Sequence, residues 1–556
     1  MHDISLNPLD QSTGIVGRLL SSTLTSASGL IVLIFTILLA YITFEYGGVL
    51  KQRMELPPGP FPLPIFGNHF AIPKSKPWIA FEQWSKEYNN PLITVWLGSR
   101  PIIILNDAWT ASDLLDKRAA IYASRPTMIV MADVSGQTNI NQTTLPYGDR
   151  WRNHRKLMHT AVGSQAVRDY RSFQGDEVKI MTKEILDSPS DYVMSIERYS
   201  SSVVSIIGWG RRISRKNDYV VQQALLLMQS VDAIIPGQYM MESIPWLSYL
   251  PSIIYALPSQ LRLGSTLFTN YFYHLSLEGS SAAEENFSKR LLREQSSSSL
   301  SNAEIAGLTA NLIGGGVDTT SSSILTFLLA MTAFPEKQRL AHEELDRVCG
   351  GRSPTWDDEA SLPYIAATVK ETLRWRTVTI LAGIPHAPTQ DDVYRGYRIP
   401  AGTTMTGNLW AIHRHEREFP EPDEFRPERY LHGLQFSYPN SRGHNAFGWG
   451  RRQCSGQPLA EQSLFSSIAR LLWAFEILPG LDEKGDVVKP DIFAYSDSEN
   501  MRPLPFAVRF VPRGEGRRAE IEREAAEAGR RLRRWEGETE LTVEGAAKGG
   551  IKVVME

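Results

Sequence analysis

The sequence predicts a mainly α-helical domain with a small β portion, behind one N-terminal transmembrane helix. Three stretches support this prediction. Residues 19–44 contain no charged side chain, and a membrane-spanning helix needs roughly 20 largely apolar residues. Two β-branched runs on either side of a Gly-Ser pair at 98–99 indicate a hairpin. A capping box at Ser301 and Glu304 opens a helical segment that continues to Phe334.

Composition narrows the class of protein. The chain has 556 residues, 42% of them hydrophobic, so it can bury a large core. A net charge of −3 gives no reason to expect a nucleic-acid partner. The two cysteines, Cys349 and Cys454, lie far apart, which argues against a secreted disulfide framework and for a reducing compartment. We therefore expect the bulk of the chain to face the cytosol.

The N-terminal part predicts a membrane anchor followed by a stiff connector. No Ala-x-Ala-like site follows the apolar run, so an uncleaved anchor is favoured over a signal peptide, which is the alternative. Lys51 and Arg53 follow the anchor and outnumber Arg18 before it, which places the later residues in the cytoplasm by the positive-inside rule. Five prolines between Pro57 and Pro64 restrict the backbone to extended geometry.

These features divide the chain into five parts. They are a lumenal segment (1–26), a transmembrane anchor (27–46), a proline-rich hinge (47–67), the main domain (68–512) and a charged C-terminal tail (513–556).

One short stretch, residues 447–456, combines three glycines, two adjacent arginines and Cys454. Glycine allows sharp turns and close approach to a flat group. The sulfur precedes a helix-prone run from Gln457 to Phe475, so the helix dipole favours thiolate over thiol. With only one other cysteine, a zinc site with several cysteines or a four-cysteine iron–sulfur cluster cannot form. A single axial thiolate on a non-covalent heme remains, or a buried structural cysteine.

This stretch resembles the Phe-x-x-Gly-x-Arg-x-Cys-x-Gly signature of the cytochrome P450 family, with matches at Phe447, Gly450, Arg452, Cys454 and Gly456. The resemblance implies heme b, with Cys454 as the axial ligand of the iron. It also implies that Phe447, Arg452 and Gly456 belong to the cofactor site, with Arg452 meeting a propionate. The main domain would then be a heme-thiolate monooxygenase domain.

Two further stretches resemble cofactor contacts of the family. Trp151 and Arg155 are four residues apart on one predicted helical face, where an indole N–H and a guanidinium can serve the same carboxylate. Taken alone, this pattern also suits a solvated basic helix with one buried tryptophan. The resemblance makes both residues propionate partners, and it implies the same role for His386.

Three glycines interrupt the middle of the long helix predicted after Ser301. Mid-helix glycine costs roughly 1 kcal/mol relative to alanine, so residues 314–316 need a reason. Close approach of a flat cofactor is one reason, with a helix bulge that frees the Thr319 hydroxyl; a flexible break is the other. The block resembles the family's Ala/Gly-Gly-x-Asp-Thr-Thr motif. The resemblance places Gly315 in the cofactor site and makes Asp318 and Thr319 the catalytic proton-delivery pair.

Glu371 and Arg374 are three residues apart on one predicted helix, and Arg429 follows later in the chain. The resemblance implies that these three form a buried structural network beneath the cysteine loop. Removal of one member of such a network strands a charge, at about 3–5 kcal/mol.

Two segments keep two interpretations each. Residues 236–268 crowd apolar and aromatic side chains among prolines, which suits either the core or a lid that dips into the membrane surface. The tail at 513–556 alternates in charge, which suits a solvated helix or disorder, and no family motif lies in it.

The resemblance implies a microsomal, fungal-type monooxygenase that uses O2 to hydroxylate or otherwise oxidise an apolar small molecule of secondary metabolism. It would span the endoplasmic reticulum membrane once, with a cytosolic catalytic domain. The sequence contains no Gly-x-Gly-x-x-Gly motif in the expected context and no phosphate-binding loop, so electrons must come from a partner, NADPH–cytochrome P450 reductase.

Five cations would form the surface for this reductase, or simply a solvated basic face: Arg150, Arg152, Lys156, Arg442 and Arg451. Two other functions stay open. A heme-thiolate isomerase or dehydratase would not need Asp318 and Thr319, and a non-catalytic heme-binding sensor would need no turnover.

Overall fold

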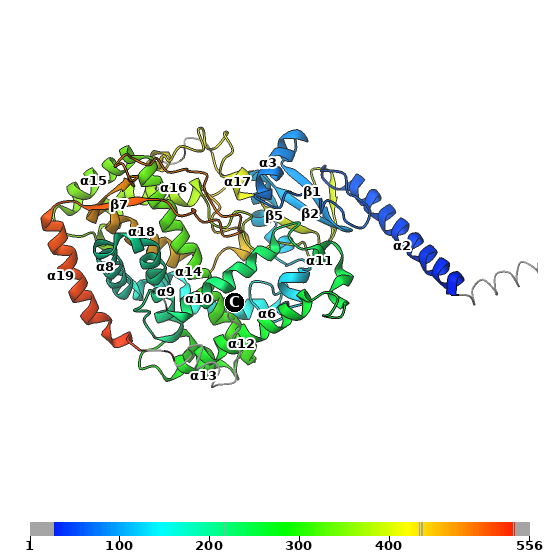
Figure 1. Ribbon diagram of the computed structural model, residues 1–556, viewed down its shortest axis with the longest axis horizontal. Helices are drawn as coiled ribbons and strands as arrows, with labels where there is room; N and C mark the ends of the chain where they lie inside the picture. The colour runs from blue at the N-terminus through cyan, green and yellow to red at the C-terminus, as the bar shows by residue number, and fades with distance from the viewer. Residues whose placement is uncertain (1–26, 217, 433, 435–436, 538, 540–556) are drawn as a thin grey trace, which may run out of the picture.

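A computed structural model describes residues 27–216, 218–432, 434, 437–537 and 539. The predicted lumenal segment at 1–26 and the end of the predicted tail, 540–556, lie outside the described residues. Within the described part of the chain, helices predominate and strands are few and short, so the predicted mainly α-helical domain with a small β portion is confirmed. Figure 1 shows the main sheet toward the end of the domain from which the N-terminal helix leaves, whereas strand β7 (Val508–Pro512) lies on the opposite side of the domain.

The main sheet contains the predicted hairpin. Strands β1 (Leu92–Leu97) and β2 (Arg100–Leu105) pair antiparallel, and Gly98 takes the turn with a φ of 62°. Strand β5 (Thr404–Gly407) pairs parallel to β2 on the other side. All six residues of β1 are buried, so the sheet is covered on both faces. The remaining ribbons are β3 (Asp392–Tyr394) with β4 (Tyr397–Ile399) and β6 (Phe475–Pro479) with β7 (Val508–Pro512).

Helix α14 (Asn302–Ala333) is the central element of the helical part. It opens with the predicted capping box: the Ser301 hydroxyl accepts from the Glu304 N–H at 3.3 Å, and the Glu304 carboxylate accepts from the Ser301 N–H at 2.8 Å. Almost all of its side chains are buried against neighbouring helices. These neighbours are α9 (Tyr192–Trp209), α10 (Tyr219–Gln229), α12 (Leu257–Ser281), α13 (Phe287–Glu294), α15 (Pro335–Cys349), α16 (Pro363–Trp375) and α18 (Gln457–Ala474).

The N-terminal helix α2 (Ala27–Glu55) projects away from the domain (Figure 1) and is one of two described helices long and apolar enough to cross a membrane. The other is α14, which is mostly buried inside the domain. Helix α2 continues past residue 46, the predicted end of the anchor, so the first residues of the predicted hinge, 47–55, are helical. The uncharged stretch is only the apolar part of the helix. The helix itself ends at Glu55, because Leu56 precedes a proline and is restricted to extended geometry.

The proline segment is held against the sheet. The Thr94 N–H donates to the carbonyl of Pro58 at 2.9 Å, and the Asn68 side chain donates to the carbonyl of Phe61 at 3.0 Å. Proline has no backbone N–H to donate, but its carbonyl still accepts a hydrogen bond. The chain therefore enters the domain at a set angle.

The apolar segment at 236–268 divides between the two interpretations. Met241, on α11 (Met240–Ser243), is fully buried in a small cluster with Ile129 and Val130. In contrast, Tyr249 and Ile253 are 87% and 94% exposed. The first part of the segment is thus core, and the following part is an exposed apolar surface.

The C-terminal segment forms a helix, as one of its two predicted states has it, but this helix is packed against the domain. Helix α19 (Glu515–Leu532) packs along α8 (Arg171–Asp187), with Trp535 buried just beyond it. Its buried apolar residues follow helical spacing: Ile521, Ala525, Ala528 and Leu532. This part of the tail is therefore the helix of the first alternative, but one face of it is packed against the domain because a narrow apolar stripe runs among the alternating charges.

Candidate active site

A cavity lies between α14, α6 (Asp149–Val162), the loop before β3 and the cysteine loop before α18. Nine of the ten side chains or glycines predicted from the sequence line it: Trp151, Arg155, Gly315, Thr319, His386, Phe447, Arg452, Cys454 and Gly456. Asp318 does not line this cavity. The fold thus brings together residues separated by as many as three hundred positions.

The cysteine loop is shaped by its glycines and tied to a neighbouring turn. Gly448 and Gly450 have φ angles of 72° and 53°, in the left-handed region that favours glycine. A Cβ on Gly450 would lie 2.3 Å from the Leu115 carbonyl oxygen, so the residue must be small. The Gly450 N–H donates to the Asp116 carboxylate at 2.6 Å, and the Cys454 N–H donates to the Phe447 carbonyl at 2.9 Å. The loop is therefore well defined where it presents the sulfur.

Protein surrounds Cys454, and its side chain is open to the cavity. Burial raises the pKa of the Cys454 thiol, while the N–H groups of Gly456 and Gln457 and the Arg155 guanidinium lower it. The predicted effect of the helix N-terminus is present but weaker than burial. Thiolate is therefore not favoured by the polypeptide alone, and a bound cation would supply the missing stabilisation.

Three guanidinium groups line the cavity, and no aspartate or glutamate among its described lining residues compensates for them: Arg125, Arg155 and Arg452. Arg452 donates to the carbonyls of Ala123 and Leu145, both at 2.6 Å, and Arg155 donates to the Ser455 hydroxyl at 2.7 Å. Burial, followed by repulsion from Arg155, lowers the pKa of Arg452 to about 9. A ligand with carboxylates would relieve this concentration of positive charge.

Trp151 and His386 complete the polar wall. The Arg452 guanidinium stacks over the Trp151 ring at 4.4 Å. His386 Nδ1 lies 3.0 Å from the Tyr122 carbonyl, which only accepts, so Nδ1 carries the proton. Burial and then Arg125 lower the pKa of His386 to about 3, so the ring is neutral and Nε2 is an acceptor. His386 would serve a propionate as donor only if that anion drew a second proton onto the ring.

The three glycines of α14 serve two purposes. A Cβ on Gly314 would lie 2.8 Å from Met228 Sδ, and a Cβ on Gly316 would lie 2.3 Å from Val204 Cγ1. These two glycines allow α10 and α9 to approach. A Cβ on Gly315 would meet nothing within 4 Å, and Gly315 is exposed to the cavity in an otherwise buried part of the helix. Only Gly315 therefore leaves room for a flat group.

The predicted helix bulge and flexible break are both absent, because α14 is continuously α-helical through this block. The Thr319 hydroxyl lines the cavity and donates to the Gly315 carbonyl at 2.5 Å. Asp318 points elsewhere: its carboxylate accepts from the Asn500 side chain at 2.7 Å, and it lines a separate cavity that also contains Arg502. Burial raises the pKa of Asp318. Adjacent positions on a helix point about 100° apart, so the predicted pair does not share one cavity.

The predicted network of Glu371, Arg374 and Arg429 is confirmed in geometry. Arg374 donates to both Glu371 oxygens at 2.9 and 2.8 Å, Arg429 approaches at 3.4 Å, and all three side chains are buried. Arg374 also donates to the His413 carbonyl, and His413 Nε2 accepts from the Asn445 N–H at 2.8 Å. Since Asn445 precedes the cysteine loop, the network positions that loop.

Two residues near the cavity carry no sequence signal of their role. Arg125 lies beside Arg452 and donates to the Ile384 and Pro385 carbonyls at 2.7 and 2.8 Å. The buried Glu499 carboxylate accepts from the N–H groups of Leu381 and Gly383 at 3.1 and 2.8 Å and so holds the cavity loop. Both act through backbone groups distant in sequence, which no local pattern reveals.

Comparison with known proteins identifies the family of this chain. A family model described as Cytochrome P450 matches residues 57–499. The chain is 34% identical to cytochrome P450 monooxygenase fogE of Aspergillus ruber, over 84% of this chain and 88% of that protein. It is 34% identical to cytochrome P450 monooxygenase virE of Hypocrea virens, over 85% and 88%, and 33% identical to cytochrome P450 monooxygenase ple1 of Rhodocybe pseudopiperita, over 83% and 90%. The chain therefore belongs to the cytochrome P450 family of monooxygenases.

Proposed function

We propose that this monooxygenase is membrane-anchored and oxidises an apolar small molecule, with Cys454 as the axial ligand of heme b. One observation carries the proposal. A cavity open to Cys454 on one element and to Gly315 on another is also lined by three partly buried arginines and by no described carboxylate. An anionic, flat group that takes a sulfur ligand fits these residues, and the family implies that this group is heme.

The polypeptide would hold the heme and manage protons around it. Arg125, Arg155, Arg452 and Trp151 would bind the propionates by charge-assisted hydrogen bonds. When bound, heme supplies the activation of O2. Thr319 would hold a proton at Oγ1 facing the cavity, whereas Asp318 faces the separate cavity on another side of α14.

The substrate would occupy the apolar part of the same cavity. Val203, Val204, Leu312, Ala382 and Ile384 line it. We place the substrate among secondary metabolites because the similar monooxygenases are fungal. Comparing metabolites of a gene-deletion strain with those of its parent would identify the compound.

The first prediction tests the ligand. Cys454→Ser should abolish the strongly red-shifted Soret band that a thiolate-ligated heme shows with carbon monoxide after reduction, because a serine oxygen does not replace the thiolate. Cys349→Ser is the matched control: Cys349 ends α15 and does not line the cavity, so its loss should leave the band intact. An unchanged band in Cys454→Ser would refute the assignment.

The second prediction tests Thr319. Thr319→Ala should keep heme and substrate binding but form less product per reductant consumed and release more peroxide. Proton relays typically contribute 10²–10⁴-fold in rate, and the effect shrinks where water replaces the hydroxyl. Ser323→Ala is a control, since that hydroxyl also lines the cavity and donates to a helix carbonyl, that of Thr319. If wild type and Thr319→Ala form equal product per reductant consumed, Thr319 has only a packing role, and the isomerase function is favoured.

We propose that electrons arrive from NADPH–cytochrome P450 reductase at a basic surface beside the cysteine loop. The guanidinium groups of Arg152 and Arg451 lie over the Tyr147 ring at 5.4 and 5.2 Å, so α6 and the cysteine loop present charge together. Lys156 is also exposed on α6, whereas Arg150 pairs with Glu304 at 2.7 Å. Such a surface suits an acidic flavoprotein.

The third prediction tests this surface. Lys156→Glu should lower the reductase-supported rate several-fold, more at low salt, because a like charge now faces the acidic partner. Turnover supported by added peroxide should stay unchanged. Arg530→Glu is a control at an exposed site on α19. Equal loss with both electron sources would mean that Lys156 affects the cavity rather than the partner.

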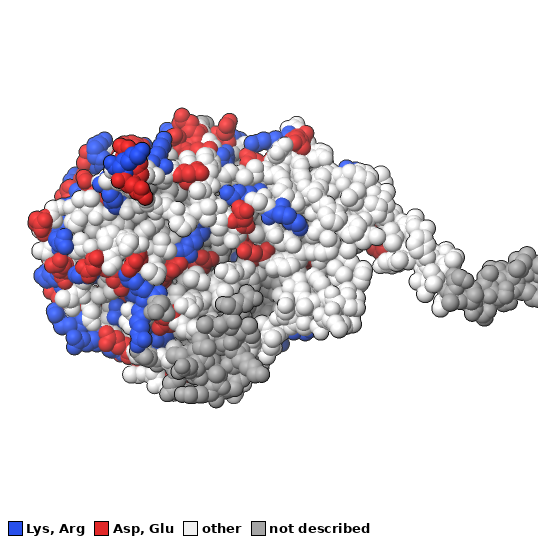
Figure 2. All heavy atoms as spheres, in the orientation of Figure 1, with Lys and Arg blue, Asp and Glu red and all other residues white. Residues whose placement is uncertain are grey.

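We propose that the membrane, that of the endoplasmic reticulum, lies at the end of the domain from which α2 leaves, with the domain in the cytosol. Exposed apolar residues of the proline segment, of the turn after it and of the 246–254 segment share this end: Phe61, Phe70, Trp246, Tyr249, Ile253 and Ile254. Figure 2 shows that this end is mainly uncharged, while charged residues gather over the part that carries α15, α8 and α19. The domain would then extend from the proline segment through α19.

The fourth prediction separates the two membrane contacts. Removing residues 1–45 should release part of the protein from membranes while the heme spectrum persists, because residues 30–44 of α2 are almost all exposed, whereas Tyr46 and Val49 pack against the domain and are kept. Adding Ile253→Asp and Ile254→Asp should release the rest, since burying a charge at the lipid surface is costly. Loss of heme on truncation would show instead that α2 belongs to the fold.

A further inference from the structure

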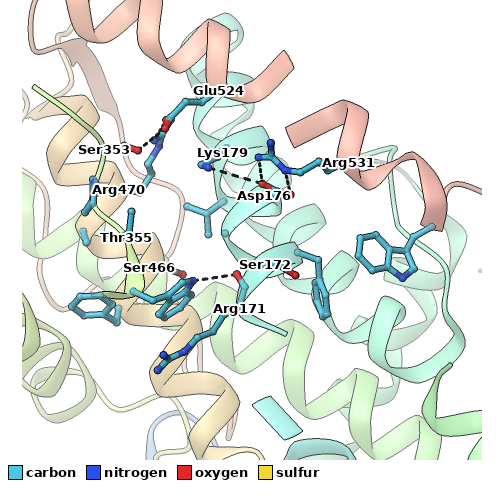
Figure 3. Close-up of a pocket in the computed structure, with 18 of the residues that line it drawn as sticks. Arg171, Ser172, Asp176, Lys179, Ser353, Thr355, Ser466, Arg470, Glu524 and Arg531 are labelled. Carbon is cyan, nitrogen blue, oxygen red and sulfur yellow. Dashed lines mark hydrogen bonds and ion pairs between the residues drawn. The ribbon is translucent and has the colours of Figure 1, made fainter. Parts of the chain in front are cut away.

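A second cavity, of 510 Å³, lies between α8, the loop at 353–356, α18 and α19 (Figure 3). It shares no lining residue with the cavity at Cys454. Helix α19 and Trp535 form one wall, and both lie beyond the residues 57–499 that the family model matches. A volume of this size suits a small organic molecule. The cavity therefore exists because this chain folds its own C-terminal segment back onto α8.

The walls offer aromatic rings. Phe173 and Trp535 lie edge to face with ring centroids 5.4 Å apart, and Trp356 and Phe465 form a second pair at 6.1 Å. Val178 of α8 adds an apolar side chain to the lining. Aromatic faces and edges of this kind hold a flat ring by offset or edge-to-face contact. The body of a ligand would thus be aromatic rather than a flexible polar chain.

The charges of the lining are unbalanced. Five cations line the cavity, namely Arg171, Lys179, Arg470, Arg531 and Arg534, against two carboxylates, Asp176 and Glu524. Both carboxylates are already engaged (Figure 3): Asp176 accepts from Arg531 at 2.9 and 2.6 Å, and Glu524 accepts from Arg470 and from the Ser353 hydroxyl. Arg171 also meets Glu359, outside the lining, at 3.8 Å. Lys179 lies 4.0 Å from Asp176, which it shares with Arg531. The excess positive charge of the lining therefore rests mainly on Arg534.

Arg470 has donors without acceptors. Its side chain is 3% exposed, and only one terminal nitrogen bonds Glu524. Its Nε and other terminal nitrogen have no hydrogen-bond partner among the described residues. Leaving a buried donor unpaired costs about 1–3 kcal/mol, so these groups favour an acceptor in the cavity. Arg534 adds a guanidinium that stacks 3.8 Å over the Trp535 ring and forms no ion pair within the described chain.

We infer that this cavity binds an organic anion with a flat aromatic body. The ring would lie between the two aromatic pairs, and its acidic group would accept from Arg470 and face Arg534. Since α18 begins just after Cys454 and its later turns line this cavity, such a ligand would join the C-terminal helix to the helix that follows the cysteine. This site does not depend on the proposed heme chemistry.

The probe is anilinonaphthalenesulfonate, an aromatic sulfonate, compared with N-phenylnaphthylamine, which has the same rings without the charge. The heme-loaded full chain should bind one sulfonate in this cavity, about tenfold more tightly than the neutral probe, as a charge-assisted hydrogen bond predicts. Binding should quench tryptophan fluorescence and leave the Soret band unshifted, because Trp356 and Trp535 line this cavity and the heme cavity is separate.

The variants separate shape from charge. Gly175 lines the cavity on α8, and a Cβ there would have only Trp356 Nε1 nearby, at 3.7 Å, so Gly175→Leu should fill the space and abolish binding of both probes. Gly264→Leu, at a helical glycine with nothing within 4 Å, is its control. Arg470→Gln should remove most of the preference for the sulfonate. Arg534→Gln should reduce it several-fold, whereas Arg533→Gln, at an exposed neighbour outside the cavity, should not.

Four outcomes support or overturn the proposal. Loss of binding in Gly175→Leu together with loss of charge preference in Arg534→Gln supports the site even where Arg470→Gln fails to fold. Wild-type binding in a folded Gly175→Leu overturns it. A Soret shift that accompanies binding places the probe in the heme cavity and overturns it too. If the wild type binds both probes with equal affinity, the cavity is an apolar site without a preference for anions, and the proposal of an anionic ligand is refuted.

Discussion

The concentration of unpaired positive charge around Cys454 is the constraint on which the rest of the site depends. Three guanidinium groups share one cavity, and each reaches only carbonyls or a hydroxyl of the surrounding protein. By doing so, Arg125 and Arg452 join backbone segments at 123, 143–145 and 384–385 that would otherwise be separate loops. The walls of the cavity are therefore organised by groups that still lack a counter-charge, and an anionic cofactor would complete both the electrostatics and the packing.

The charge state of the Cys454 sulfur also depends on a bound ligand. Burial acts against the thiolate more strongly than the nearby N–H groups and Arg155 act for it. A cationic metal at the sulfur and carboxylates at the arginines would each relieve one unfavourable charge state. Neither alone would relieve both. The residues on the two sides of the cavity thus fit one ligand that carries opposite charges at different places.

Helix α18 links this site to the C-terminal segment. Its first turn follows the cysteine loop. Near its other end, Arg470 pairs with Glu524 of α19. The C-terminal helix is thus a structural part of the domain. It also creates a second cavity whose chemistry, aromatic with excess positive charge, differs from the apolar part of the first.

The sequence alone was sufficient for the fold class, the hairpin around Gly98, the capped start of α14 and the cysteine loop, because each depends on residues within a few positions of one another. It could not separate the reasons for the three glycines, since Met228 and Val204 come from other helices. For the same reason it missed Arg125 and Glu499, and it paired Asp318 with Thr319 although they face different cavities. Local spacing determines which element forms and which side chains share its face, whereas packing between distant elements decides which face meets a cavity, a neighbour or a charge.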